Sequence, residues 1–227
     1  MPFEIGLLLY PGLTQLDLTG PFEVLHRLPD ARVHLVSKTL DPVRSDSGLG
    51  LLPTTRMDAC PALDLVFVPG GYGQIALMSD AEVLDFLRRQ AAGARYVTSV
   101  CTGALLLGAA GLLAGFEAAT HWAYMELLPA FGAKPVDRRV VVDRNRITAG
   151  GVTAGIDFGL RVVAEIAGAD VAKAIELELE YDPEPPFRSG HPRVAEPALV
   201  AEAKRKVAER LAERKARIEA ALGGSSA

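Results

Sequence analysis

Short apolar runs alternate with segments of helical periodicity along most of this chain. The clearest run is Asp64-Leu65-Val66-Phe67-Val68, which is apolar after its first residue and is followed by Pro69-Gly70-Gly71. A continuous apolar strand of this kind is typical of the centre of a parallel sheet, where both faces are buried. The alternation therefore predicts an α/β fold of flavodoxin-like type, with a mostly parallel central sheet and helices on both of its faces.

The same pattern places the other elements. We expect further strands at residues 4–10, 31–37 and 96–100, short extended pieces within 43–55, a brief strand at 118–120 and a hairpin of residues 139–143 and 146–149. Expected helices cover residues 21–28, 79–92, 104 onward, 122–131, 153–167 and the segment after 170. Pro21 suits the first position of its helix. Ser79-x-x-Glu82 has the pattern of a capping box.

The composition changes at residue 182. Four prolines, at 183, 185, 186 and 192, predict a linker that forms neither helix nor ladder. The helix expected after the linker, at 197–222, carries one apolar stripe: Val200, Val207, Leu211, Ile218 and Leu222. We therefore divide the chain into an α/β domain at 1–181 and a linker with an amphipathic helix at 182–227. Periodicity does not decide whether that helix docks on its own domain or on a second subunit.

Bulk properties narrow the class of protein. The 227 residues carry a formal charge of −4, which argues against a nucleic-acid-binding surface. Residues 96–116 are uncharged and long enough to cross a bilayer, but their polar residues and glycines predict a strand, a turn and a buried helix instead. The chain begins with a strand-like segment and has two cysteines in unrelated contexts, so we expect a cytoplasmic protein.

Cys101 is the leading candidate for a reactive residue. It lies in Ser99-Val100-Cys101-Thr102-Gly103, between the expected strand and helix, where small neighbours permit the sharp turn of a nucleophile elbow. The N-terminus of the following helix favours a thiolate over a thiol. A buried structural cysteine is the alternative.

Three further segments are expected at the carboxyl ends of adjacent strands, where open α/β sheets bind ligands. Asp17 could exchange protons with the thiol, or could serve as an Asx-turn or capping residue. Gly70 and Gly71 allow backbone amides to form an oxyanion hole with the N–H of Thr102, or could form only a tight turn. Gly150 and Thr153, from Gly150-Gly151-Val152-Thr153, are expected to contribute to substrate binding from a third segment. The Gly150-Gly151 pair could let the backbone approach the site or act as a hinge for the next helix, or could be only an ordinary turn.

Neither a metal site nor a cofactor is expected. The four histidines, at 26, 34, 121 and 191, lack metal-ligand spacing with the cysteines. His121 is interpreted as a structural or helix-start residue in preference to a catalytic one. The sequence also contains neither GxGxxG nor GxxxxGK[ST].

Taken together, the acidic residue after the first strand, Val68-Pro69-Gly70-Gly71 and the elbow cysteine resemble the DJ-1/PfpI superfamily. Within it, four segments are similar to the isocyanide hydratases: Gln15 to Pro21, Ser99 to Gly103, Thr120-His121-Trp122 and Gly150 to Asp157. The resemblance implies a cofactor-free homodimer that hydrates a small isocyanide to an N-substituted formamide. In that reading Cys101 is the nucleophile, Asp17 the acid and base, Thr102 a hydrogen-bonding and oxyanion residue, and Gly71 a backbone donor.

Other readings of the same motifs stay open. Thr102 stands where protease-like members carry histidine, which argues against a peptidase. A glyoxalase or deglycase-like enzyme acting on small dicarbonyls would use the same thiol. A ligand-sensing domain like that of AraC-type regulators and an oxidation sensor are the non-enzymatic alternatives. A regulator needs a DNA-reading module, which residues after Tyr181 do not predict.

Overall fold

The computed structural model describes the backbone of residues 1–223 and the side chains of residues 1–220. Seven of its strands form one sheet, parallel except for the hairpin strand at one edge. Across the sheet the strands are β10 (Val140–Asp143), β11 (Arg146–Ala149), β7 (Tyr96–Val100), β6 (Leu65–Val68), β1 (Phe3–Leu8), β2 (Ala31–Ser37) and β5 (Thr55–Arg56). The apolar strand β6 is therefore central, as its sequence predicts, and all four of its residues are buried.

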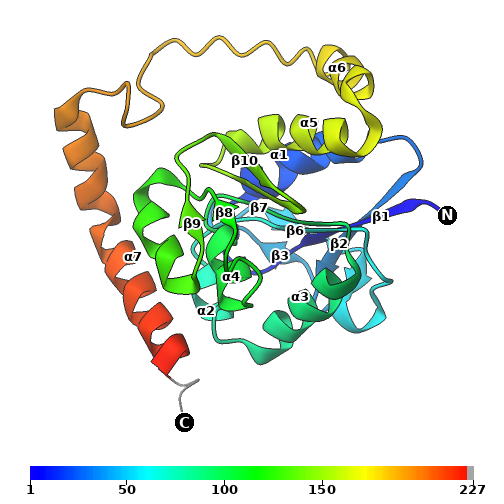
Figure 1. The fold of residues 1–227 in the computed structure, drawn as a ribbon, viewed down its shortest axis with the longest axis horizontal. Helices are drawn as coiled ribbons and strands as arrows, with labels where there is room; N and C mark the ends of the chain where they lie inside the picture. The colour runs from blue at the N-terminus through cyan, green and yellow to red at the C-terminus, as the bar shows by residue number, and fades with distance from the viewer. Residues whose placement is uncertain (224–227) are drawn as a thin grey trace.

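Helices cover both faces of the sheet, which confirms the predicted α/β class (Figure 1). One face carries α1 (Gln15–Leu25) and α5 (Ala154–Ala167), with α6 (Ala169–Glu178) packed on α5. The other carries α3 (Ala81–Gly93) and α4 (Gly103–Ala109), with α2 (Gln74–Leu77) and the 3₁₀ helix η2 (Trp122–Phe131) against α4. The core between these layers consists mainly of Leu, Val, Ile, Ala and Phe side chains.

The remaining elements are short. Two small sheets lie beside the main one, formed by β3 (Val43–Arg44) with β4 (Gly50–Leu51) and by β8 (Glu117–Ala118) with β9 (Lys134–Pro135). A single 3₁₀ turn, η1 (Met57–Ala59), follows β5. The expected strand at 31–37 and the hairpin of β10 and β11 are confirmed.

The prediction for the first helix was wrong. Pro21 is not its first residue but lies inside α1, which begins six residues earlier at Gln15. A proline inside a helix removes one backbone hydrogen bond, here the one that the carbonyl of Asp17 would accept. Pro21 instead packs closely against α5, where a Cβ on Gly155 would lie 2.8 Å from its Cδ. Asp17 therefore belongs to the first turn of a helix and not to a loop before it.

The predicted capping box was also wrong by one residue. Asp80 caps α3, and its side chain accepts a hydrogen bond from the Val83 N–H at 3.3 Å. Ser79 instead donates its hydroxyl to the carbonyl of Ala76. Asp and Ser are both good caps, and the extended backbone at Asp80 decides between them.

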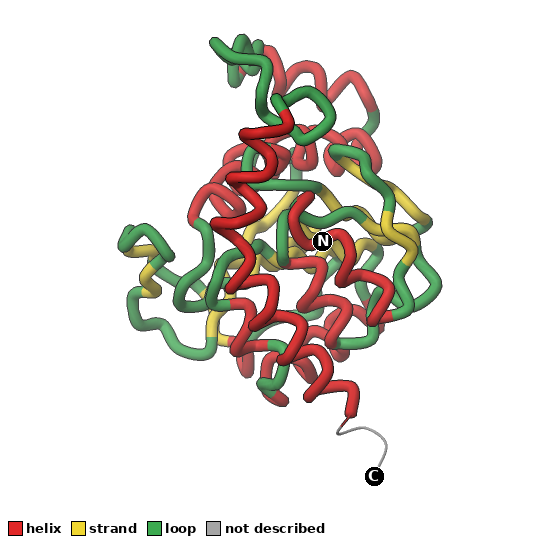
Figure 2. Tube along the Cα trace, turned by 90° about the vertical axis from the view of Figure 1, so that its left-hand side faces the viewer, coloured by secondary structure: helices red, strands yellow, loops and turns green. Residues whose placement is uncertain are grey.

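The C-terminal helix α7 (Pro197–Gly223) lies across one end of the molecule and packs on η2 and α2 of the same chain (Figures 1 and 2). Residues 182–196 form the predicted linker, which crosses the molecule from α6 to α7. From the apolar stripe, Ile218 is buried and Leu211 packs against the core. The side chain of Leu222 and residues 224–227 lie outside the described residues.

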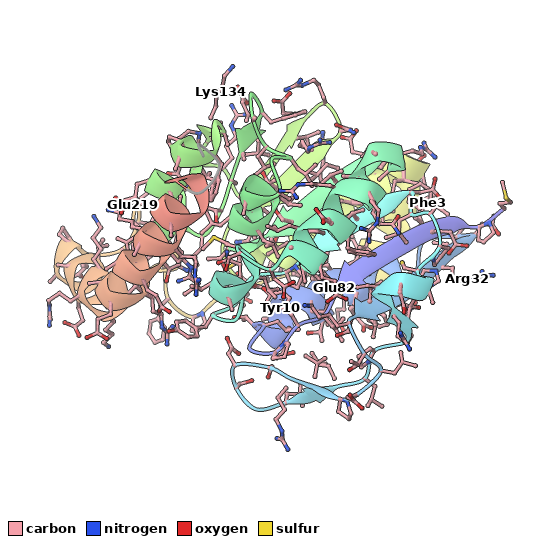
Figure 3. The ribbon with its side chains drawn as sticks, turned by 90° about the horizontal axis from the view of Figure 1, so that it is seen from below. Phe3, Tyr10, Arg32, Glu82, Lys134 and Glu219 are labelled. Atoms are coloured by element: carbon pink, nitrogen blue, oxygen red, sulfur yellow. The ribbon has the colours of Figure 1, made fainter. Side chains whose placement is uncertain are left out.

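The carboxyl ends of the parallel strands point toward α7. In Figure 3, Phe3 marks the first residue of β1, and Tyr10 follows the carboxyl end of that strand. Tyr10 lies nearer than Phe3 to α7, which carries Glu219. Among the described residues, no helix is long and apolar enough to cross a membrane.

Candidate active site

Cys101 occupies the predicted elbow between β7 and α4. Its φ of 54° is in the left-handed region, which L-residues seldom adopt and which is often retained at functional sites. Neighbouring groups fix this backbone: the Cys101 N–H donates to the carbonyls of Ala149 (3.1 Å) and Gly150 (2.8 Å), and the Thr120 hydroxyl donates to the Cys101 carbonyl at 2.7 Å. Cys101 is 6% exposed, so the residue is almost enclosed.

Three groups from two other segments, α1 and the elbow, converge at Gly70. A Cβ on this residue would lie 2.6 Å from Asp17 Oδ2, 2.7 Å from the Thr102 nitrogen and 2.8 Å from the Cys101 Cβ. Glycine is required there because any side chain would displace all three. The predicted meeting of Asp17, Gly70 and the elbow at one edge of the sheet is therefore what the structure shows.

A second close approach sets the start of α4. A Cβ on Gly103 would lie 2.1 Å from the Val68 carbonyl oxygen, so only glycine allows the first turn of α4 to reach the end of β6. The elbow and the segment after β6 are held together by this contact.

Asp17 is fully buried beside the thiol. Its Oδ2 accepts the Gly70 N–H at 3.0 Å, and its Oδ1 is buried without a hydrogen-bond partner among the described residues. The carboxyl is near enough to interact with the Cys101 sulfur, although that contact lacks the geometry of a closed hydrogen bond. Burial raises the pKa of Asp17 from 3.8 to about 7, against the lowering effects of the thiol and the Gly70 N–H.

The thiol differs from the expected low-pKa thiolate. Burial raises the pKa of Cys101 well above its ordinary value, and the charge of Asp17 raises it further. The N–H of Thr102 and the charge of Arg214 lower it but do not prevail. Near neutral pH the sulfur therefore keeps its proton, while the Asp17 carboxyl is close to its pKa of about 7. Because the two groups interact, they titrate as a coupled pair.

The N–H groups of Gly70 and Gly71 were expected to face an open site, but in the structure both are already hydrogen-bonded. The Gly70 N–H is bound to Asp17, and the Gly71 N–H donates to the Thr102 hydroxyl at 3.1 Å. The Thr102 hydroxyl is in turn 3.4 Å from the Gly71 carbonyl, to which it donates. Buried amides pair with the nearest acceptor, and here these acceptors are side chains of the site itself.

The third predicted segment contributes unequally. Gly150 supports the elbow through the carbonyl that accepts the Cys101 N–H. Thr153 is exposed, and its carbonyl and hydroxyl are contacted by the Arg139 guanidinium at 3.0 and 3.4 Å. Those contacts do not join Thr153 to the cluster around Cys101.

His121 behaves as a helix-start residue, as interpreted from the sequence. It precedes η2, and its Nδ1 accepts the Ala123 N–H at 3.3 Å. Burial lowers the pKa of its imidazole to about 4, so the ring is neutral near pH 7. Among the described residues no group of three or more His, Cys, Asp or Glu side chains could hold a metal ion.

Two residues of the site were missed by the sequence analysis. Arg214 of α7 is 2% exposed, and its Nη2 lies 3.4 Å from the Gly71 carbonyl. Tyr10, just past β1, is buried and donates its hydroxyl to the Pro69 carbonyl at 2.7 Å. A charged residue on an amphipathic helix is usually exposed, so the sequence carries no signal for a buried Arg214.

Comparisons with known proteins identify relatives of this chain. An isonitrile hydratase from Pseudomonas putida is 58% identical over 208 residues, which are 92% of this chain and 91% of that protein. The solved structure of a ThiJ/PfpI family protein from Pseudomonas syringae has a TM-score of 0.94 at 45% identity and covers 96% of this chain and 91% of its own. The HTH-type transcriptional regulator GbdR of Pseudomonas aeruginosa is 32% identical over 189 residues, which are 80% of this chain and 51% of the regulator.

The family assignment follows from one further match. The model of the DJ-1/PfpI family matches residues 4–165, which include Asp17, Gly70 and the Cys101 elbow. This agrees with the resemblance inferred from the sequence, and the chain belongs to the DJ-1/PfpI family.

Proposed function

We propose that this protein is an isocyanide hydratase, a cysteine-dependent hydro-lyase that adds water to an isocyanide and releases an N-substituted formamide. The observation that carries the proposal is the buried pair of Asp17 and Cys101, in which the pKa of the carboxyl is raised to about 7. A carboxyl with this pKa can accept and return a proton near neutral pH. The high identity to the isonitrile hydratase supports the same substrate class.

The first half of the reaction is covalent. As the Cys101 sulfur attacks the terminal carbon of the isocyanide, its proton passes to Asp17 and a carbon–sulfur bond forms. Asp17 then gives that proton to the same carbon, which leaves a thioimidate with a carbon–nitrogen double bond. Asp17 Oδ1, which has no hydrogen-bond partner among the described residues, is the oxygen available for this transfer. A thiol that ionises only during attack agrees with the raised pKa of Cys101.

The second half uses Asp17 as a base. The carboxylate takes a proton from water while the water oxygen bonds to the thioimidate carbon, and the nitrogen receives that proton. The carbon–sulfur bond of the tetrahedral species then breaks, its hydroxyl proton returns to sulfur by way of Asp17, and the formamide leaves. The thiol proton ends on the formyl carbon and the two water protons end on nitrogen and sulfur, so the cycle is balanced.

The decisive experiment follows the sulfur and the product together. On mixing with an alkyl isocyanide we expect an intact-mass adduct on Cys101 that disappears as formamide accumulates. Cys101→Ala should abolish formamide production, and Cys101→Ser, a poorer nucleophile, should reduce it by several orders of magnitude. Cys60→Ala is the matched control because Cys60 is the other free cysteine and lies outside the site. Full activity of Cys101→Ala would rule out covalent catalysis.

A parallel incubation with methylglyoxal distinguishes the dicarbonyl-directed enzyme. Lactate formation there, without formamide formation from the isocyanide, would replace the proposed reaction with a glyoxalase reaction at the same cysteine.

We further propose a homodimer in the cytoplasm. The resemblance to the family supports the dimer, and the two unpaired cysteines fit a reducing compartment. Sedimentation equilibrium would test the assembly, with twice the chain mass of 24.1 kDa expected.

A further inference from the structure

Arg214 is a buried cation without an ion-pair partner among the described residues. Arg214 is 2% exposed, and Arg and Lys are almost never fully buried unless they are paired. An unpaired charge in a protein interior is strongly unfavourable unless another charge or a set of dipoles offsets it. Its environment should therefore contain the compensating group.

The contacts of Arg214 lead to the active site. The guanidinium lies over the Tyr124 ring of η2, with Cζ 4.2 Å from the ring centroid. Its Nε donates to Gln74 Oε1 of α2, and its Nη2 donates to the Gly71 carbonyl, both at 3.4 Å. The third nitrogen, Nη1, is buried and has no hydrogen-bond partner in the described part of the chain.

The Gly71 carbonyl connects Arg214 to the nucleophile. The same oxygen accepts the Thr102 hydroxyl, which also accepts the Gly71 N–H. Thr102 directly follows Cys101, and its own N–H interacts with the sulfur. A guanidinium on the C-terminal helix thus contacts the peptide group that holds the residue next to the thiol.

We propose that Arg214 is a positioning residue for the Cys101 thiol. It orients the Gly71 carbonyl, and with it the Thr102 hydroxyl, and its buried charge offsets the negative charge that the Asp17–Cys101 pair acquires when it loses a proton. The family model matches residues 4–165, and Arg214 lies beyond them. The match to the family therefore does not include this role.

The charged surroundings of the pair favour this assignment. The titratable groups that influence Cys101 are Asp17 from α1 and Arg214 from α7, and Asp17 is also influenced by Asp46. Tyr10 is neutral, since burial holds the pKa of its hydroxyl well above its ordinary value. His121 is neutral near pH 7. Arg214 is therefore the cation among these groups, and it lowers the pKa of Cys101 while Asp17 raises it.

The test measures the sulfur and needs no isocyanide. The rate of Cys101 alkylation by iodoacetamide is followed against pH, with peptide-resolved mass spectrometry to separate Cys101 from Cys60. In the wild type we expect the rate to rise as Asp17 loses its proton near its pKa of about 7. Arg214→Met removes the charge that lowers the pKa of Cys101, and a nearby opposite charge shifts a pKa by about 1–3 units. We therefore expect the midpoint to move upward by about one pH unit, which corresponds to a roughly fivefold loss of reactivity at pH 7.

Three further variants separate charge from packing. Arg214→Lys keeps the charge and should retain most of the wild-type profile. Arg214→Gln keeps hydrogen-bond donors without the charge, should shift the midpoint as Met does, and replaces the Met variant if that protein does not fold. Arg217→Met removes an exposed arginine from the same helix and should leave the profile unchanged, because the Arg217 guanidinium donates to the Ser79 hydroxyl, away from the site.

An unchanged midpoint in folded Arg214→Met or Arg214→Gln would overturn the proposal, as would a Lys variant that shifts as far as Met. The inference rests on the proposed function only for its effect on turnover. If the wild type formed no formamide but the alkylation profiles shifted as expected, the hydratase assignment would fail and the role of Arg214 would stand.

Discussion

At the scale of single residues, the site depends on a carboxyl and a thiol that are both buried and share their protons. Burial disfavours the charged form of each group, so neither is ionised as readily as it would be in water. The cost of this arrangement should appear in the stability of the protein. Its sign follows from the direction of the pKa shift at Asp17.

Asp17→Asn should make stability less dependent on pH. Because the folded protein holds the Asp17 proton between 3.8 and about 7 and the unfolded chain does not, the free energy of unfolding of the wild type falls as pH rises through that interval. The Asn side chain cannot ionise, so the variant should be more stable than the wild type above about pH 7, by a few kcal/mol at about 1.4 kcal/mol per pKa unit. Urea unfolding at a series of pH values measures this difference.

The difference between the two proteins is the informative quantity. Burial lowers the pKa of His121 to about 4, which makes stability rise with pH over an overlapping range, and this contribution cancels between variant and wild type. Turnover of Asp17→Asn should fall by about 10²–10⁴-fold, as expected for a lost acid and base. A flat stability difference with normal turnover would leave Asp17 as a structural residue of α1.

At the scale of elements, the site is formed by the close approach of β6, α1 and the β7–α4 elbow. This meeting is predictable from the sequence because it follows from local rules: a strand ends, glycine permits the turn, and parallel strands end at the same edge. The position of Pro21 inside α1 could not be predicted from the sequence, because the packing of α5 that accommodates the proline is a tertiary feature. The same limit explains Asp80, where the backbone chose between two adjacent capping residues.

Gly70→Ala tests this approach. The added methyl group would lie 2.6–2.8 Å from Asp17, the Thr102 nitrogen and Cys101, so one of them must move. We expect turnover to fall by at least about 10²-fold because misplacement of reacting groups by about 1 Å has this effect. Gly93→Ala at the end of α3 is the control, since its methyl group would meet nothing within 4 Å. Equal activity of the two variants would contradict the crowded geometry at Gly70.

At the scale of the whole molecule, the C-terminal helix returns to the edge of the sheet that carries the thiol. Two residues of the linker contact Asp137: Arg193 forms an ion pair with it, and His191 Nε2 lies 3.3 Å from Asp137 Oδ1. The sequence predicted the helix and its stripe but not its partner, because a periodic stripe states only that one face is covered. Within the chain, α7 contacts η2 and α2.

Ile218→Ala measures how firmly α7 is docked. Ile218 is 3% exposed, and truncation of a buried isoleucine costs about 2–5 kcal/mol. Leu199→Ala, on the same helix at 52% exposure, should change stability by no more than about 0.5 kcal/mol. Denaturant unfolding of both proteins tests the docking. Similar values for the two would mean that the helix is not held by this face.

The buried contact of Arg214 with Gly71 also bears on the order in which the protein is made. The strands, the elbow and the carboxyl of Asp17 leave the ribosome well before the arginine does. A nascent chain can therefore assemble its sheet early, while the guanidinium reaches the Gly71 carbonyl only after α7 has been synthesised. Full reactivity should then require a chain that already includes α7, and a chain that carries the sheet alone should fall short of it.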